Sequence, residues 1–169
     1  GIQNVQLEPF TIPAGWVRGS ASGAMISPMS RPLSIASLGW SPSTPAGGVK
    51  GNVLIVSDVS DEKLKQAEQF RGKILLLDTS KIFADGYAKA LPKLDAAWPV
   101  FQKAGALGVI TTDREKNNVL NAHDMTWGAK MLPLPGAEIG MEDGKLIERE
   151  LEHGPVVIQF SLQNETAGE

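Results

Sequence analysis

Continuous apolar runs recur through the middle and the end of the chain, and helical patterns lie between them. Because these runs lack alternating polar positions, they are typical of strands covered on both faces. We expect strands at Gly51–Ser57, Ile74–Leu77, Leu107–Ile110, Leu132–Ile139 and Val156–Phe160. The first is rich in β-branched residues and should lie centrally in a sheet.

Three segments carry apolar residues at helical spacing. Ser60 offers an N-cap for a short helix that ends near Gly72, and Glu142–His153 predicts a second helix. The longest pattern should place four side chains against the core: Leu91, Leu94, Trp98 and Phe101. Pro92 suits a first helical turn, whereas Pro99 removes an amide donor and predicts a kink or an interruption.

The first fifty residues are rich in glycine, proline and serine and predict short strands and turns around Val5–Phe10 and Leu33–Leu38. A polar loop is expected from Thr111 to about Lys130. With 169 residues, of which 42% are hydrophobic, the chain is sized for one core. The order of elements predicts a single α+β domain over residues 1–169, a small open β-barrel or sandwich flanked by two or three helices.

Charge and composition exclude several classes of protein and of site. A net charge of -3 without basic clusters gives no surface for nucleic acid, and no apolar stretch approaches the length of a membrane helix. The absence of cysteine removes disulfides and thiolate chemistry. Gly1 resembles the remnant of a removed tag and the last residues resemble a linker, so we expect a domain excised from a longer protein.

Known catalytic motifs are not matched. Gly19–Gly23 has alanine where a nucleophile elbow needs serine, and Gly47–Gly51 lacks the spacing of a phosphate-binding loop. With only two histidines, a three-ligand zinc site has few candidates, and we expect no catalytic and no metal-binding residue in this chain. His153 is interpreted as a residue at the C-terminus of the second helix, where a basic side chain interacts favourably with the helix dipole.

The loop residues His123, Asp124 and Trp127 are the candidate contact to a substrate or partner, with a solvated loop as the simpler alternative. Trp16 and Trp40 lie in turn-rich segments and are candidate aromatic contacts to a partner, or else cover the edge of the core. Glu138, Glu142 and Asp143 form an acidic cluster, and the last two fall where carboxylates stabilise the start of a helix.

The order of several short motifs resembles a protease-associated domain, in particular the one inserted in M28-type zinc peptidases similar to plasma glutamate carboxypeptidase. The resemblance runs from about Val5 to Leu162. Its markers are Trp16–Gly19, Leu38–Pro45, Gly48–Val49, Gly72–Ile74, Tyr87, Ala104–Ala106 and Pro133–Leu146. Where relatives often carry His-Thr-Gly, this chain has His123, Asp124 and Met125.

The resemblance implies a non-catalytic domain of a secreted or periplasmic enzyme, which covers the active site, restricts access to it or contributes to assembly. The implied partners are the catalytic domain of the same chain, a peptide substrate and a second copy of the parent protein, whose catalytic domain would hold the zinc. This segment would then need no cofactor of its own. Two other hypotheses remain: a self-standing module that binds a peptide or a sugar, and a small hydrolase with an unrecognised Ser-His-Asp arrangement.

Overall fold

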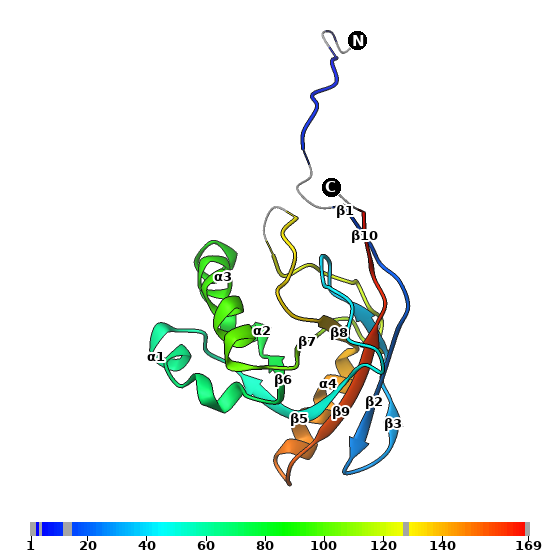
Figure 1. Cartoon of the computed structure of the whole chain (residues 1–169), viewed down its shortest axis with the longest axis vertical. Helices are drawn as coiled ribbons and strands as arrows, with labels where there is room; N and C mark the ends of the chain where they lie inside the picture. Colours follow the sequence, from blue (N-terminus) through cyan, green and yellow to red (C-terminus); the bar gives the residue numbers. More distant parts are fainter. Residues whose placement is uncertain (1–2, 4, 12–14, 127–128, 168–169) are drawn as a thin grey trace.

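A computed structural model describes residues 3, 5–11, 15–126 and 129–167 of the chain. Within these ranges, strands and helices follow one another as an α+β domain (Figure 1). In chain order the elements are β1 (Gly15–Val17), β2 (Ala21–Ser27), β3 (Arg31–Pro32), β4 (Ile35–Ser37), β5 (Val49–Val56), α1 (Asp61–Leu64), the 3-10 helix η1 (Ala67–Phe70), β6 (Lys73–Leu77), α2 (Thr79–Ile82), α3 (Tyr87–Ala104), β7 (Gly108–Thr112), β8 (Gly136–Ile139), α4 (Met141–Leu151), β9 (Val157–Leu162) and β10 (Glu165–Ala167).

The main sheet is mixed and has eight strands in the order β3-β2-β9-β5-β6-β7-β8-β4. Strands β5 to β8 run parallel to one another, while β9, β2, β3 and β4 pair antiparallel with their neighbours. The sheet curls into a partly open barrel with helices beside it (Figure 1). The predicted fold class is confirmed, and β5 lies in the middle of the sheet as expected.

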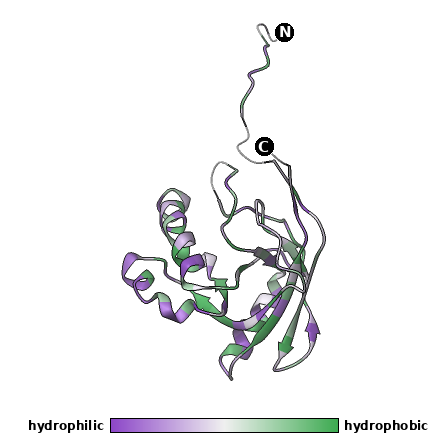
Figure 2. Ribbon diagram, in the orientation of Figure 1, coloured by the Kyte–Doolittle hydropathy of each residue, from purple (hydrophilic) through white to green (hydrophobic). Residues whose placement is uncertain are grey.

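Successive side chains of a strand point to opposite sides, and in the parallel strands β6, β7 and β8 both of these sides are buried. In β6, Ile74 and Leu76 join a cluster with Ile147 of α4, whereas Leu75 and Leu77 join a cluster beneath α3. Apolar colour in Figure 2 accordingly concentrates on the strands of the sheet, while the helices carry both apolar and polar residues. In β5 the prediction of full burial is wrong at Ile55, which is 37% exposed.

Helix α3 covers one face of the sheet with Leu94, Trp98 and Phe101, all of which are buried as predicted. Of the kink or interruption predicted at Pro99, the interruption is wrong, since the helix runs through this residue to Ala104, and a kink there stays a prediction. Pro99 lies on the exposed side, where water can satisfy the carbonyl group that loses its amide partner. The continuous apolar side of α3 then holds the two halves of the helix together.

Several helices and strands begin or end at other residues than predicted, because the local pattern of apolar residues does not show which strands pair. The helix predicted from Ser60 to Gly72 is divided into α1 and η1, Pro92 lies in the second turn of α3, and the strand predicted from Leu132 is limited to β8. The described residues from Val5 to Phe10 form no strand and expose Val5, Leu7 and Phe10. None of the helices in the described part is long and apolar enough to cross a membrane.

Strands β1 and β10 form a separate two-stranded antiparallel ribbon at one end of the domain (Figure 1). Gly15 pairs with Ala167, and Val17 pairs with Glu165. The chain therefore enters and leaves the main sheet at neighbouring positions.

Candidate functional site

Two parallel strands place polar side chains on one face of the sheet where they end. Thr111 of β7 lies directly opposite Glu138 of β8, so both side chains point to the same side. Asp113 follows Thr111 by two residues and shares that side. This is the face on which α3 packs, because Val109, also two residues from Thr111, belongs to the cluster beneath that helix. Carboxyl ends of parallel strands are where binding sites of open α/β sheets commonly form.

Asp113 holds the start of the loop that follows β7. Its Oδ1 accepts hydrogen bonds from the backbone amides of Arg114 at 2.5 Å and Glu115 at 2.9 Å, and its Oδ2 accepts from the amide of Asn121 at 2.6 Å. Burial acts to raise the pKa of this carboxyl group, but the backbone hydrogen bonds outweigh burial, and the pKa lies below its ordinary value. Asp113 is therefore an ionised group that is only 2% exposed.

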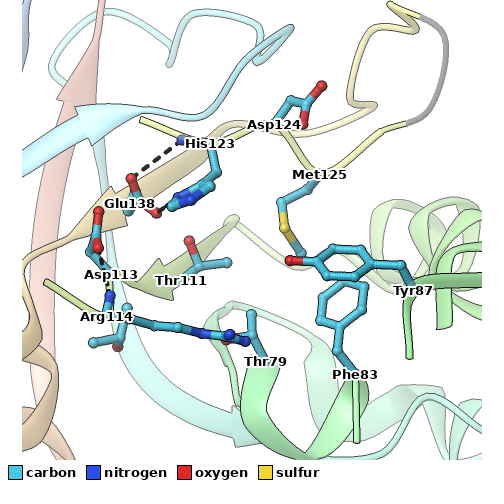
Figure 3. Close-up of a pocket in the computed structure, with 11 residues that line it drawn as sticks. Thr79, Phe83, Tyr87, Thr111, Asp113, Arg114, His123, Asp124, Met125 and Glu138 are labelled. Carbon is cyan, nitrogen blue, oxygen red and sulfur yellow. Dashed lines mark hydrogen bonds and ion pairs between the residues drawn. The ribbon is translucent and has the colours of Figure 1, made fainter. Parts of the chain in front are cut away.

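Glu138 holds the far end of the same loop. Its Oε2 accepts from the amide of Ala122 at 2.7 Å, and its Oε1 lies 2.6 Å from Nδ1 of His123 (Figure 3). Glu138 is 2% exposed, whereas 53% of the His123 side chain is exposed. When the ring is neutral, a proton on Nδ1 donates to Glu138 and leaves Nε2, on the opposite side of the ring, as an acceptor.

Further contacts fix the backbone around His123. The amide of Gly39 donates to the His123 carbonyl oxygen at 2.9 Å, and Nη2 of Arg18 donates to the Ala122 carbonyl oxygen at 3.1 Å. Arg18 comes from the segment directly after β1 and also donates through Nε to Ser37. The His123 backbone is thus tied to the sheet, to the segment around Gly39 and to the end of the ribbon.

A pocket of about 150 Å³ opens beside these residues (Figure 3). Its opposite wall is formed by Phe83, Tyr87 and Met125. The ring centroids of Phe83 and Tyr87 lie 4.5 Å apart. The hydroxyl oxygen of Thr111 is buried and has no hydrogen-bond partner among the described residues. The pocket therefore combines an apolar wall with a polar wall, as small binding sites usually do.

Of the loop residues predicted to contact a substrate or partner, the structure describes His123 and Asp124. His123 and Asp124 are both exposed and both line the pocket, but His123 pairs with Glu138 instead of with its neighbour Asp124. Trp127 lies outside the described residues. Contact with a substrate or partner stays a prediction for all three.

Trp16 and Trp40 lie together at the base of the ribbon. Their rings stack at 6.3 Å, both residues are half-buried, and the Trp16 indole donates to the Ser41 carbonyl oxygen at 2.8 Å. The guanidinium carbon of Arg18 lies 5.2 Å from the centre of the Trp16 ring. These rings cover the edge of the domain where the ribbon begins, and a contact to a partner stays a prediction.

The acidic cluster expected from sequence is divided in the structure. Glu142 and Asp143 lie in the first turn of α4 as predicted, and they also hold loops: Glu142 accepts from the amides of Asn117 and Asn118, and Asp143 accepts from that of Ser34. Those amide hydrogen bonds from Asn117 and Asn118 lower the pKa of Glu142. Glu138 belongs instead to the group around His123, and His153 is exposed just beyond the end of α4.

Sequence reasoning missed Asp113 and Thr111, which the polar composition of the segment assigned to a loop. The signal was available, because Thr111 and Asp113 alternate at the end of a buried run that is followed by another strand. In the structure, ligand atoms of Asp113, His123 and Glu138 all lie within 4.8 Å of one another. Imidazole nitrogen and carboxylate oxygen are zinc ligands, so these three residues could hold a metal ion.

Comparison with known proteins relates the chain to peptidases. No family model matches it. It is 29% identical to carboxypeptidase Q from Homo sapiens and 28% identical to carboxypeptidase Q from Mus musculus, in each case over 98% of this chain. The chain spans only 35% of the length of these two relatives.

Solved structures share the fold. A peptidase M28 precursor from Shewanella amazonensis SB2B superimposes with a TM-score of 0.65 at 23% identity, over 92% of this chain and 36% of that one. An aminopeptidase from Aneurinibacillus sp. strain AM-1 gives a TM-score of 0.62 at 16% identity, over 91% of this chain and 33% of that one. BSAP, a zinc aminopeptidase from Bacillus subtilis, also gives 0.62, at 15% identity and over 94% of this chain and 33% of that one.

The fold is therefore that of a protease-associated-type domain, which occurs as one segment of larger peptidases. The sequence relatives are more specific than the fold, because this chain matches one segment of carboxypeptidase Q over nearly its whole length. The resemblance inferred from the sequence motifs is confirmed.

Proposed function

We propose that the chain is a non-catalytic accessory domain of a zinc metallopeptidase, which covers the active site of a catalytic domain and controls the access of peptides to it. The main support for this proposal is the β1–β10 ribbon, which brings together the beginning and the end of a segment that matches about a third of carboxypeptidase Q. A domain with adjacent ends can be inserted into a loop of another domain without disturbing either core.

The zinc-dependent chemistry is assigned in this proposal to the remainder of the parent protein. The zinc aminopeptidase from Bacillus subtilis supports this assignment, because its matching segment is likewise only a third of the whole enzyme. A parent of this kind would be exported, and its subunits could pair through the accessory domain. Both of these points are part of the proposal.

The loop around His123 is the proposed surface that faces the peptide. It presents His123 and Asp124 beside a pocket with aromatic side chains, and Trp127 follows in the sequence. Arg18 connects this loop to the ribbon through its hydrogen bond to Ala122. The orientation of the loop is therefore fixed relative to the point where the catalytic domain would attach.

Excision of the domain from the full-length protein tests the proposal. Because Val17 pairs with Glu165, replacing the intervening residues with Asn-Gly should close the ribbon as a two-residue hairpin. We expect the shortened protein to hydrolyse a dipeptide, while its discrimination between dipeptides and longer peptides, measured as a ratio of kcat/KM values, changes at least about fivefold, or about 1 kcal/mol.

The matched measurement uses the chain by itself. With added Zn²⁺ it should hydrolyse no dipeptide, because the proposal assigns catalysis to the other domain. Hydrolysis by the isolated chain, or unchanged discrimination after excision, would contradict the accessory role. Reaction of the isolated chain with a serine-directed covalent probe would instead favour a small hydrolase.

A further inference from the structure

We propose that Asp113, His123 and Glu138 bind one divalent transition-metal ion of the Zn²⁺ type within this chain, with Thr111 hydrogen-bonded to the bound ion's water. This site is independent of the proposed accessory role, since it needs no catalytic domain. It also differs from the sequence-based expectation that this segment holds no metal.

The positions of the donor atoms support the site. Among the described residues, His123 Nδ1 is the partner of Glu138 Oε1, and Asp113 Oδ2 accepts one hydrogen bond, from the amide of Asn121. Each of these oxygens therefore keeps acceptor capacity for an ion. The remaining oxygens, Oδ1 of Asp113 and Oε2 of Glu138, are held by backbone amides, which orient both carboxylates as partners of metal ligands commonly do.

The ligand types indicate the class of metal. One imidazole and two carboxylates match the nitrogen and oxygen donors of Zn²⁺, with a fourth position open to water. Ca²⁺ is less suited, because it takes six to eight oxygen ligands. The ion would replace the proton between His123 Nδ1 and Glu138 Oε1, and that proton would be released to solvent.

Thr111 supplies a second observation that points to a ligand. It is 3% exposed, and its hydroxyl group has no partner among the described residues, which is unfavourable for a buried polar group. Register places it opposite Glu138, and Figure 3 shows its oxygen pointing toward the His123 ring. Water on an ion held by Asp113, His123 and Glu138 would give this hydroxyl group a partner.

The negative charge of the pocket also favours a bound cation. Asp113 and Glu138 are both 2% exposed and lie on one side of the sheet, so their mutual repulsion is poorly screened. Asp124 adds a third carboxylate to the same pocket, and Arg114 is the single arginine among the described residues that line it. A divalent cation would reduce this excess of negative charge.

Titration of the metal-free chain with Co²⁺ and Zn²⁺ tests the site. The expected result is one ion per chain, with visible Co²⁺ bands that Zn²⁺ removes and with shifted imidazole NMR signals of His123. The chain has only two histidines and no cysteine, so His153→Ala is a matched control and should bind as the unmodified chain does. His123→Ala should weaken binding at least about 100-fold, since it removes a direct ligand.

Thr111→Val separates a metal site from a purely structural cluster. It should weaken metal binding about tenfold, as loss of a hydrogen bond to the ligand shell does, while leaving the melting temperature of the metal-free chain unchanged or raised. The proposal is overturned if no saturable binding occurs, or if binding in folded His123→Ala equals that in His153→Ala. Either result leaves the accessory role untouched, because that role is tested by hydrolysis and excision.

Discussion

At the scale of single residues, buried and half-buried carboxylates organise the irregular part of the chain. Asp113, Glu138 and Glu142 each accept hydrogen bonds from the amides of a loop that has little secondary structure of its own. Sequence reasoning located Glu142 at the start of a helix but could not name its loop partners, which lie 24 and 25 residues away. Types of side chain are readable from sequence, whereas partners depend on tertiary packing.

Asp78 allows a test of one such carboxylate at the start of α2. Burial acts to raise its pKa, but hydrogen bonds from Ser80 and Lys81 and the charge of Lys81 lower the pKa below its ordinary value. Asp78→Ala should therefore reduce the free energy of unfolding by about 1 kcal/mol at neutral pH, as loss of an N-cap does. Urea unfolding at several pH values measures this difference.

The pH dependence has a definite sign. Because the folded-state pKa of Asp78 is depressed, its contribution is present above the unfolded-state value and is lost as the pH falls through the folded-state pKa. The difference between the unmodified chain and Asp78→Ala should thus shrink in acid. Asp78→Asn is the control, since it keeps a capping oxygen and should cost less. A difference that grew in acid would contradict this account.

At the scale of elements, α4 was predicted well because its apolar spacing and acidic first turn are local signals. Its N-terminus, however, is capped from a distance: Asn118 Oδ1 accepts hydrogen bonds from the amides of Glu142 and Asp143. Close packing of α4 on β7 is also invisible in a local pattern. A Cβ added at Gly144 would overlap the side chain of Thr112.

Gly144→Ala tests that contact. Alanine favours a helix interior by about 1 kcal/mol over glycine, so propensity alone predicts stabilisation. We expect instead a net loss of about 1–2 kcal/mol in the free energy of unfolding, because overpacking against the sheet opposes it. Thermal and urea unfolding give the sign directly.

Two further variants make the Gly144 result specific. Gly154→Ala is the matched control, since an added Cβ there meets no atom within 4 Å, and it should change stability little. Thr112→Ala should recover part of the loss when combined with Gly144→Ala, because it removes two of the three overlapping atoms. Stabilisation by Gly144→Ala would show that α4 can move away from the sheet.

At the scale of the whole molecule, the buried strands could be predicted but their neighbours could not. Leu75 to Leu77 and Val109 to Ile110 are continuous apolar runs, which pair as adjacent parallel strands. In contrast, β9 lies between β2 and β5, and β4 pairs with β8 across about 100 residues of sequence. Such pairings decide where Glu138 meets His123, so the site was only partly predictable.

A circular permutant tests whether the ribbon joins a self-contained domain. Linking Ala167 to Gly15 through a short Gly-Ser linker and opening the chain between Asp85 and Gly86 should preserve the circular dichroism spectrum. The free energy of unfolding should stay within about 2 kcal/mol, since the new loop is short and the new ends are exposed. A permutant opened inside β5, between Leu54 and Ile55, should fail to fold. Failure of the first permutant would show that the β1–β10 pairing depends on other parts of the protein.

The stacked Trp16 and Trp40 rings give the ribbon an optical signature of its own. Two indoles at 6.3 Å couple their electronic transitions, so a closed ribbon should produce a paired positive and negative circular dichroism signal in the ultraviolet. Trp98 lies apart from them, buried beneath α3, and reports on the core through its fluorescence. Detachment of the ribbon and unfolding of the core can therefore be observed as separate events in a single unlabelled sample.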